Sequence, residues 1–222
     1  MYKIETHLHT AHSSKCGWLG AATLTQAYRT AGYDGIIVTD HFNRITFDYL
    51  NVDLSGPTDK VRAFLDGYER MAEEGARRGL RIYKGAELRF DECENDYLLF
   101  GWPDELLADP EAVFRMGIAA FAPLARAAGA VIVQAHPYRW GCTPAIARYL
   151  DGVEVVNRNP RHKNRNDRAA EYAQQFGLLG LCGSDCHQPT DIGLGGILTE
   201  ELPEDSDAMA ALIRAGAYTL IE

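Results

Sequence analysis

The sequence predicts an α/β fold in which a parallel sheet closes into a barrel with helices on its outside. Short apolar runs alternate with segments whose apolar residues recur at helical spacing. Such strand–helix–strand units give a parallel sheet, and this many units in 222 residues favour closure into a barrel. No repeat of fixed period and no linker rich in Pro, Gly or Ser divides the chain, so we expect one domain over residues 1–222. A doubly wound open sheet is the alternative fold.

Strands are predicted where short apolar runs, rich in β-branched or aromatic residues, are bounded by turn-forming or polar residues. In chain order they cover residues 2–8, 35–40, 81–88, 97–102, 130–135, 152–156 and 178–183, with a late pair at 196–199 and 218–221.

Helices are predicted between these strands. The clearest covers residues 59–78, where one buried face is formed at three-and-four spacing by Val61, Phe64, Leu65, Tyr68 and Met71. Further helices are predicted over residues 23–30, 111–128, 166–176 and 207–215.

Composition and charge exclude several classes of protein. No apolar run reaches the ~18 residues that a membrane helix needs, and the polar motif at His7 begins too early for a signal peptide, so we expect a cytoplasmic protein. Five cysteines without a Cys-x-x-Cys pair predict reduced thiols, not a disulfide framework or a zinc ribbon. The net charge of −9 disfavours binding to duplex nucleic acid, which depends on a basic surface.

Histidines and acids stand where the predicted strands end. The carboxyl ends of the strands in a parallel barrel carry the active site, so these residues are expected to converge on one rim. His7 and His9 point to the same face of their strand because strand side chains alternate, so both imidazoles can reach one cation. The other rim residues are Asp40, His41, Glu87, His136, Glu154, Asn157, Asp185 and His187.

Mixed imidazole and carboxylate side chains suggest a metal-dependent hydrolase. They suit zinc, manganese or iron(II), and a bridging carboxylate allows two cations to lie ~3.5–4 Å apart. Such a cluster activates water and neutralises phosphate charge. Covalent catalysis is disfavoured because Ser184 and Cys186 face away from their neighbours Asp185 and His187, and no Gly-x-Ser-x-Gly elbow is present.

Five ordered motifs, spread over nearly the whole chain, resemble those of the polymerase and histidinol phosphatase (PHP) superfamily. They are His7-Leu8-His9, Val38-Thr39-Asp40-His41, Gly85-Ala86-Glu87, Ala135-His136-Pro137 and Gly183-Ser184-Asp185-Cys186-His187. The resemblance implies a distorted (β/α)7 TIM-like barrel, two or three divalent metal ions (zinc, manganese or iron), and hydrolysis of phosphate esters.

The resemblance also implies a role for each matching residue. One metal would be held by His7, His9, Glu87 and Asp185. Glu87 would bridge from that metal to a second one at His136. A third metal would lie at His41 and His187, which would also assist the leaving oxygen. Asp40 would not bind a metal itself but would orient the residues that do.

Two positions of the family pattern are not matched. The family usually has Asp or His seven or eight residues after the first histidine of the pair, where this chain has Ser14 and Lys15. The nearest substitutes are His12 and Cys16. The family's histidine before the next strand after the glutamate is also absent, and Asp96 is the nearest candidate. His12 and Asp96 are therefore additional candidate ligands.

Basic residues near the rim are candidates for binding an anionic substrate. Residues 157–168 contain one acid and five basic residues, and this segment either focuses an anion toward the metals or forms a solvated loop. We expect Arg139 and Arg158 to bind substrate, because a guanidinium clasps phosphate through two donors. Weaker candidates are Arg44 and Arg89. The aromatic residues Trp140 and Phe42 are expected to pack in loops or the core.

Three functions are compatible with these residues. The first is a freestanding phosphoesterase that acts on a phosphomonoester or phosphodiester: histidinol phosphate, a nucleotide or short oligonucleotide, or a phosphotyrosine protein. The second is an amidohydrolase-like enzyme that cleaves a C–N bond, although no metal-bridging lysine stands at a strand end. The third is a degenerate barrel that binds an anionic ligand or a partner protein. The oligomeric state is open.

Overall fold

The structure of the protein is a computed structural model that describes residues 1–56 and 59–221. Its strands form a sheet in the order β10-β9-β1-β2-β4-β5-β6-β7-β8, with β3 pairing beside β4. The strands are β1 (Tyr2–Glu5), β2 (Gly35–Val38), β3 (His41–Phe42), β4 (Arg81–Arg89), β5 (Asp96–Phe100), β6 (Val131–Gln134), β7 (Gly152–Asn157), β8 (Leu179–Gly183), β9 (Ile197–Thr199) and β10 (Thr219–Leu220).

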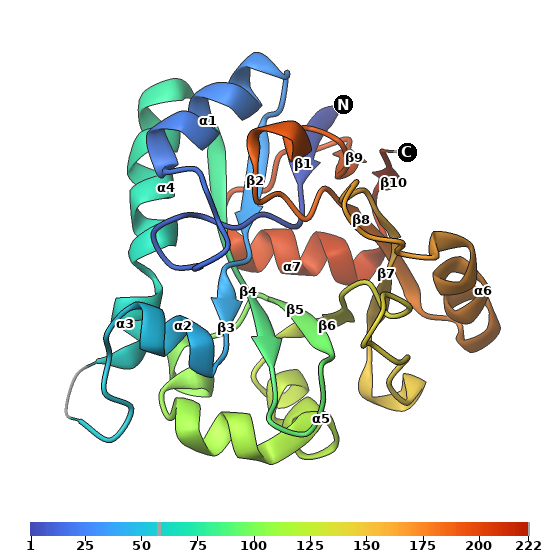
Figure 1. Cartoon of the computed structure of the whole chain (residues 1–222). Helices are drawn as coiled ribbons and strands as arrows, with labels where there is room; N and C mark the ends of the chain where they lie inside the picture. The colour runs from blue at the N-terminus through green and yellow to red at the C-terminus, as the bar shows by residue number, and fades with distance from the viewer. Residues whose placement is uncertain (57–58, 222) are drawn as a thin grey trace.

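The sheet curls into a nearly closed barrel, as Figure 1 shows, and this confirms the predicted α/β barrel. Just beyond the ends of β1 and β8, Leu8 and Cys186 form a parallel bridge that closes the seam. The His9 N–H donates to the carbonyl of Cys186 at 2.9 Å, and the Cys186 N–H donates to the carbonyl of His7 at 3.0 Å. The closing bridge therefore lies within the segments that carry the predicted ligands.

The sheet is not parallel throughout, contrary to the prediction. β5 runs antiparallel to β4 and β6, and β9 runs antiparallel to β1 and β10. Only residues 90–95 connect β4 to β5, which is too short for the crossover that parallel strands need, so the two form a hairpin. The pairs β1–β2, β2–β4, β6–β7 and β7–β8 are parallel, as expected.

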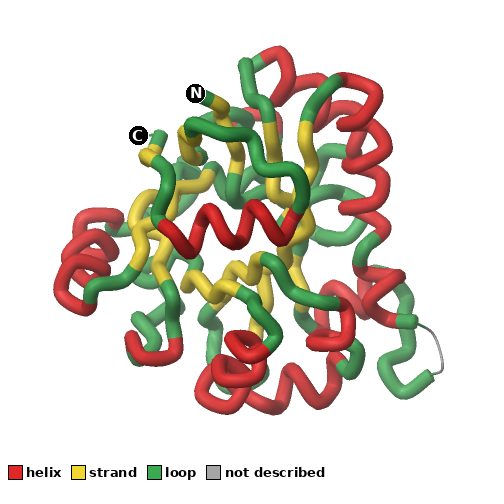
Figure 2. Tube along the Cα trace, turned by 180° about the vertical axis from the view of Figure 1, so that it is seen from behind, coloured by secondary structure: helices red, strands yellow, loops and turns green. Residues whose placement is uncertain are grey.

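Helices surround this barrel (Figures 1 and 2). They are α1 (Ala21–Thr30), α2 (Arg44–Tyr49), α3 (Lys60–Phe64), α4 (Asp66–Arg78), α5 (Pro110–Ala127), α6 (Asn166–Phe176) and α7 (Ser206–Ala215), with short 3-10 helices η1 (Asp104–Leu107), η2 (Ala147–Tyr149) and η3 (Pro189–Asp191). Aspartate side chains cap the first turns of α3, α5 and α7 by accepting backbone N–H bonds. α4, α6 and α7 end at glycines with left-handed backbone. None of the helices within the described residues is long and apolar enough to cross a membrane.

The helix predicted over residues 59–78 is divided at Leu65 into α3 and α4. The Ser13 hydroxyl donates to the Phe64 carbonyl at 2.7 Å and accepts the Gly67 N–H at 3.0 Å, so a side chain takes up the backbone groups at the break. A Cβ at Gly67 would lie 2.5 Å from Asp40 Oδ2, so only glycine allows α4 to start this close to the rim. α2 was not predicted.

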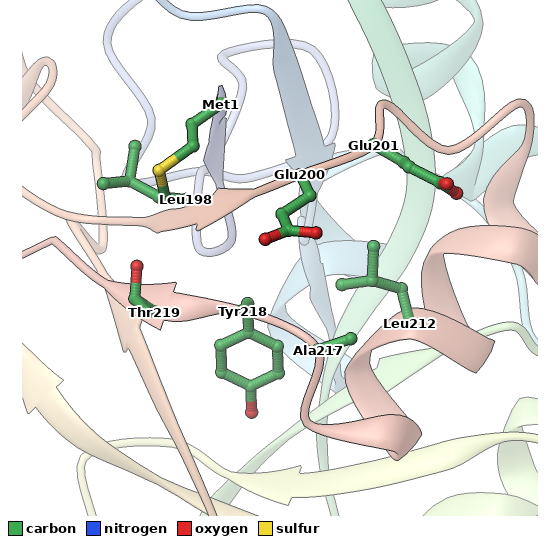
Figure 3. A pocket seen from close by; sticks show the side chains of 8 residues that line it. All are labelled: Met1, Leu198, Glu200, Glu201, Leu212, Ala217, Tyr218 and Thr219. Carbon is green, nitrogen blue, oxygen red and sulfur yellow. The ribbon is translucent and has the colours of Figure 1, made fainter.

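α7 covers the barrel on the side away from the viewer in Figure 1, and it lies in front in Figure 2. Its buried residues pack with side chains from most strands of the barrel in one apolar cluster that includes Met209, Ala210, Ile213, Ile4, Ile37, Tyr83, Val133 and Leu181. A separate cavity of about 390 Å³ lies between α7 and β9–β10 (Figure 3). None of the predicted site residues lines it; its lining residues are Met1, Leu198, Glu200, Glu201, Leu212, Ala217, Tyr218 and Thr219.

Candidate metal centre

The structure brings most of the predicted ligands together at one end of the barrel. A cavity of about 340 Å³ is lined by His41, Glu87, Asp96, His136, Asp185 and His187. His7 and His9 are fully buried, and both contact Glu87 and Asp185. These residues come from the segments after β1, β6 and β8 and from β3, β4 and β5, so segments far apart in sequence meet here.

Four side chains converge on one point, and the ligand atoms of three of them, His7, His9 and Asp185, all lie within 4.8 Å of one another. His7 Nε2 lies 3.1 Å from His9 Nε2, 3.2 Å from Glu87 Oε1 and 3.5 Å from Asp185 Oδ1. His9 Nε2 lies 3.4 Å from Glu87 Oε2 and 3.5 Å from Asp185 Oδ1. Ligand atoms about 2.0–2.1 Å from a tetrahedral zinc ion are about 3.3 Å apart, so this set fits a divalent metal.

Hydrogen bonds behind the two histidines orient their rings. The His7 Nδ1–H donates to Glu154 Oε1 at 3.0 Å, because a carboxylate only accepts, so in the neutral, metal-binding form of the ring His7 Nε2 carries the lone pair. His9 Nδ1 lies 3.4 Å from the Ser14 hydroxyl, which donates to Asp40 Oδ1 at 2.7 Å. With both Nδ1 atoms protonated, two buried Nε2 lone pairs face each other at 3.1 Å, an arrangement that a cation relieves.

Glu87 connects this set to two further groups. Its Oε1 lies 3.2 Å from His136 Nε2, and its Oε2 lies 2.7 Å from His41 Nδ1. Glu87 Oε2 and His41 Nδ1 are buried, and neither has a hydrogen-bond partner among the described residues. These two atoms therefore fit ligands of a shared cation better than a direct hydrogen bond to each other. His41, Glu87 and Asp96 form one group of ligand atoms that all lie within 4.8 Å of one another, and His9, His41 and His187 form another.

Two of the predicted site residues do not join the cluster. The Nε2 of His12 accepts the Ala21 N–H at 3.2 Å, so this imidazole lies at the start of α1 and is in none of the groups of ligand atoms found among the described residues. Arg158 is exposed and lines a neighbouring cavity, not the one that contains the ligands.

Arg139 lines the ligand cavity, as predicted, and is firmly held there. Its Nη2 donates to Asp185 Oδ2 at 2.5 Å and to Asn157 Oδ1 at 3.0 Å, and its Nε donates to Asn164 Oδ1 at 2.9 Å. Arg161 lines the same cavity and makes two bonds to Asp191. The basic segment therefore contributes Asn159, Arg161 and His162 to the cavity wall, and not Arg158.

Sequence reasoning missed several residues of the cavity wall, namely Trp18, Asn159, His162 and Gln188. His162 lies within the basic segment, which gave the one signal that could have found it. Trp140 and Phe42 differ from each other: Phe42 is buried in the core as expected, whereas Trp140 is 95% exposed, contrary to the expected packing.

The ionisation of His7 and His9 reflects their buried, charged surroundings. Burial disfavours the imidazolium form of His7, but the carboxylates of Glu154, Asp185 and Glu87 outweigh burial and hold its pKa well above the ordinary value. Burial, together with two neighbouring imidazoles, holds the pKa of His9 well below the ordinary value. His7 therefore competes for a proton wherever no metal is bound.

The other imidazoles around Glu87 behave like His7. Burial opposes protonation of His41, but Glu87 outweighs it and the pKa of His41 is well above the ordinary value. For His136, burial and Arg139 favour the neutral form, while Cys142 and Glu87 raise the pKa to about 9. Burial would raise the pKa of the Glu87 carboxyl, but the surrounding imidazoles hold it well below its usual range.

Metal affinity is expected to rise with pH, because a metal must displace protons from His7, His41 and His136. The pKa values of these three groups lie above the ordinary histidine value of about 6.5, and the pKa of His136 is about 9. The groups therefore lose their protons only as the pH rises above about 6.5. Each displaced proton contributes up to about tenfold in apparent affinity per pH unit in this window. Calorimetric titration with Mn²⁺ at several pH values, in buffers of different ionisation enthalpy, measures both effects. Constant affinity without proton release would contradict the assignment.

Two candidate ligands have strained backbone. His136 and Asp185 have φ angles of 28° and 49°, and the other non-glycine residues with positive φ in the described chain are Asn51 and Arg165. This conformation costs on the order of 1–3 kcal/mol in a non-glycine residue and concentrates at functional sites. The strain places both side chains at the rim.

A matched pair of substitutions measures this strain. Both His136→Gly and His136→Ala remove the imidazole, but only glycine adopts φ 28° freely. The glycine variant is expected to be about 1 kcal/mol more stable to denaturant in metal-free solution, after part of the gain is offset by its greater freedom when unfolded. Equal stability, or a more stable alanine variant, would show that the backbone is not strained.

Comparison with known proteins agrees with this fold. Residues 163–218 match a family model described as PHP-associated. A two-domain protein from Bacteroides vulgatus, described as containing a predicted PHP-like metal-dependent phosphoesterase, has 17% identity and a TM-score of 0.70 over 99% of this chain. This chain spans 64% of that protein. A search of curated proteins found no match.

Two other solved structures resemble the chain over nearly their whole lengths. A protein from Bifidobacterium adolescentis described as a metal-dependent phosphoesterase has 19% identity and a TM-score of 0.55, with 96% of each chain covered. An amidohydrolase from Chromobacterium violaceum, solved with bound sulfate and no metal, has 16% identity and a TM-score of 0.61, with 99% of this chain and 98% of that chain covered. At these identities the likeness shows the shared fold.

Proposed function

We propose that the chain is a member of the PHP superfamily and that it hydrolyses phosphate esters with a metal-activated water, which the matched family model and the shared fold support. The observation that carries the proposal is the convergence on His7 Nε2 and His9 Nε2, which lie 3.1 Å apart, of Asp185 Oδ1 at 3.5 Å from each and of the two Glu87 oxygens at 3.2 and 3.4 Å. Divalent cations bound there would lower the pKa of a water molecule and neutralise phosphate charge.

Other residues of the site have expected roles in bridging the metals, orienting the phosphate and assisting the leaving oxygen. Glu87 faces His7 and His136 through one oxygen and His9 and His41 through the other, so it can join neighbouring metal positions. Arg139 and Arg161 line the cavity and place two guanidinium groups where they can orient an anionic phosphate. His41 and His187, which also line the cavity, are positioned to assist the leaving oxygen.

The proposed substrate is a small phosphorylated compound, such as a nucleotide or a short oligonucleotide. The cavity of about 340 Å³ is in the size range of small-molecule sites. Its wall carries three arginines, Arg89, Arg139 and Arg161, in a chain of net charge −9. Glu87, Asp96 and Asp185 line the same wall, so the arginines would attract an anion together with metal ions that offset these carboxylates.

C–N bond hydrolysis is the second candidate, because the chain also shares its fold with an amidohydrolase. No lysine is among the residues that line the cavity in the described part of the chain, so a lysine that joins two metals is not available there. This favours phosphate esters over C–N bonds.

A substrate panel separates the two candidates. The protein is loaded with Mn²⁺, Zn²⁺ or Fe²⁺ and assayed against phosphomonoesters, phosphodiesters and cyclic or linear amides. We expect turnover of a phosphate ester and none of the amides. Amide turnover alone would replace the proposal by the second candidate, and no turnover together with no bound metal would support a barrel that only binds ligands.

A further inference from the structure

Trp18 stands out on the wall of the ligand cavity, because its side chain is 66% exposed. A large aromatic side chain gains free energy when it is buried, so such exposure at a cavity has a cost. The other residues that line this cavity are charged, polar or imidazole side chains, apart from Cys16. Trp18 therefore provides the one large apolar surface among the described lining residues.

The loop around Trp18 is fixed by hydrogen bonds. The backbone N–H of Trp18 donates to the carbonyl of His187 at 2.9 Å, and the backbone N–H of Ala11 donates to the carbonyl of Leu19 at 2.9 Å. A Cβ at Gly17 would lie 2.5 Å from the Thr10 carbonyl oxygen, so glycine allows the loop to fold back tightly on itself. The backbone of Trp18 is thus held beside a candidate metal ligand, and its side chain lines the ligand cavity.

We propose that Trp18 is a specificity-determining residue that stacks on a planar aromatic ring in the alcohol part of the substrate. This inference rests on the proposed function, because the metals and arginines would hold the phosphate while Trp18 contacts the group attached to it. Aromatic rings stack on indole with a gain that aliphatic groups of the same size do not match. The preferred substrates are therefore phosphate esters that carry an aryl or heteroaryl group.

The test compares two ligands that differ only in planarity. Benzylphosphonate and cyclohexylmethylphosphonate are not hydrolysed and have similar size and charge, so their binding to the Mn²⁺-loaded protein can be measured by calorimetry. We expect the wild-type protein to bind benzylphosphonate about tenfold more tightly. Trp18→Ala should remove this preference, and Trp18→Phe should keep part of it. Trp140→Ala, which removes an exposed indole outside the cavity, should change neither affinity.

The outcomes distinguish this inference from the proposed function. Equal affinities in the wild-type protein, or a preference that survives in Trp18→Ala, would overturn the role of Trp18 even if phosphate esters are hydrolysed. Binding of neither phosphonate would also overturn it. Absence of bound metal and of any turnover on phosphate esters would instead count against the proposed function. Thermal melts of both Trp18 variants check that the fold is intact.

Discussion

Replacing His7 and His9 together by alanine is expected to abolish tight metal binding and to lower hydrolysis by on the order of a thousandfold. The two Nε2 atoms lie 3.1 Å apart and face Glu87 and Asp185, so the double variant removes half of this ligand set. The remaining carboxylates and neighbouring imidazoles cannot complete four-fold coordination at the same point. Bound metal is measured by elemental analysis after dialysis, and turnover is measured on a responsive phosphate ester.

His12→Ala is the matched control for this double variant. His12 lies three residues after His9, but its imidazole accepts a hydrogen bond from the Ala21 N–H at the start of α1. Loss of that cap should cost about 1 kcal/mol of stability while metal content and turnover stay close to wild type. Undiminished metal content in the double variant, or a loss in His12→Ala as large as that in the double variant, would refute the ligand assignment.

Glu87→Gln is expected to remove more than one metal ion per chain and to lower kcat/KM by at least about a hundredfold. The two Glu87 oxygens face different imidazoles, with Oε1 near His7 and His136 and Oε2 near His9 and His41. Glutamine keeps the shape of the side chain but replaces one ligand oxygen with an amide nitrogen and removes the negative charge. The variant should therefore fold normally and fail to join two metal positions.

The control for this charge change is Glu94→Gln. The Glu94 carboxylate is 70% exposed and pairs with Arg89, which lines the cavity, but it contacts none of the candidate ligand imidazoles in the described structure. Its neutralisation should leave metal content unchanged. A Glu87→Gln protein that keeps the wild-type number of metals would show that Glu87 is a ligand of one ion at most and does not bridge.

Most of the ligand cluster could be located from the sequence because strand ends are visible in it. His7 and His9 follow β1, two residues apart in sequence, and the later motifs lie in or directly after apolar runs that are strands in the structure. The barrel converts these separate strand ends into one rim. Their roles as ligands stay predictions until metal is measured.

Features that depend on contacts between distant residues could not be predicted in this way. The antiparallel β5 follows from the short connection after β4, and the helix break at Leu65 depends on Ser13, which is 52 residues earlier in the chain (65 − 13). Ser14 looked like a missing ligand, yet its hydroxyl links His9 to Asp40. The place of Trp18 depends on its backbone bond to His187, which no local pattern reveals.

The number of metal ions bound per chain, after reconstitution with Mn²⁺ or Zn²⁺ and removal of free metal, is the most direct test of the assignment of the cluster around Glu87 as a metal centre. We expect at least two ions per chain, because Glu87 connects the group at His7, His9 and Asp185 to further ligands at His41 and His136. A content near zero at saturating metal would contradict the assignment of this cluster as a metal centre.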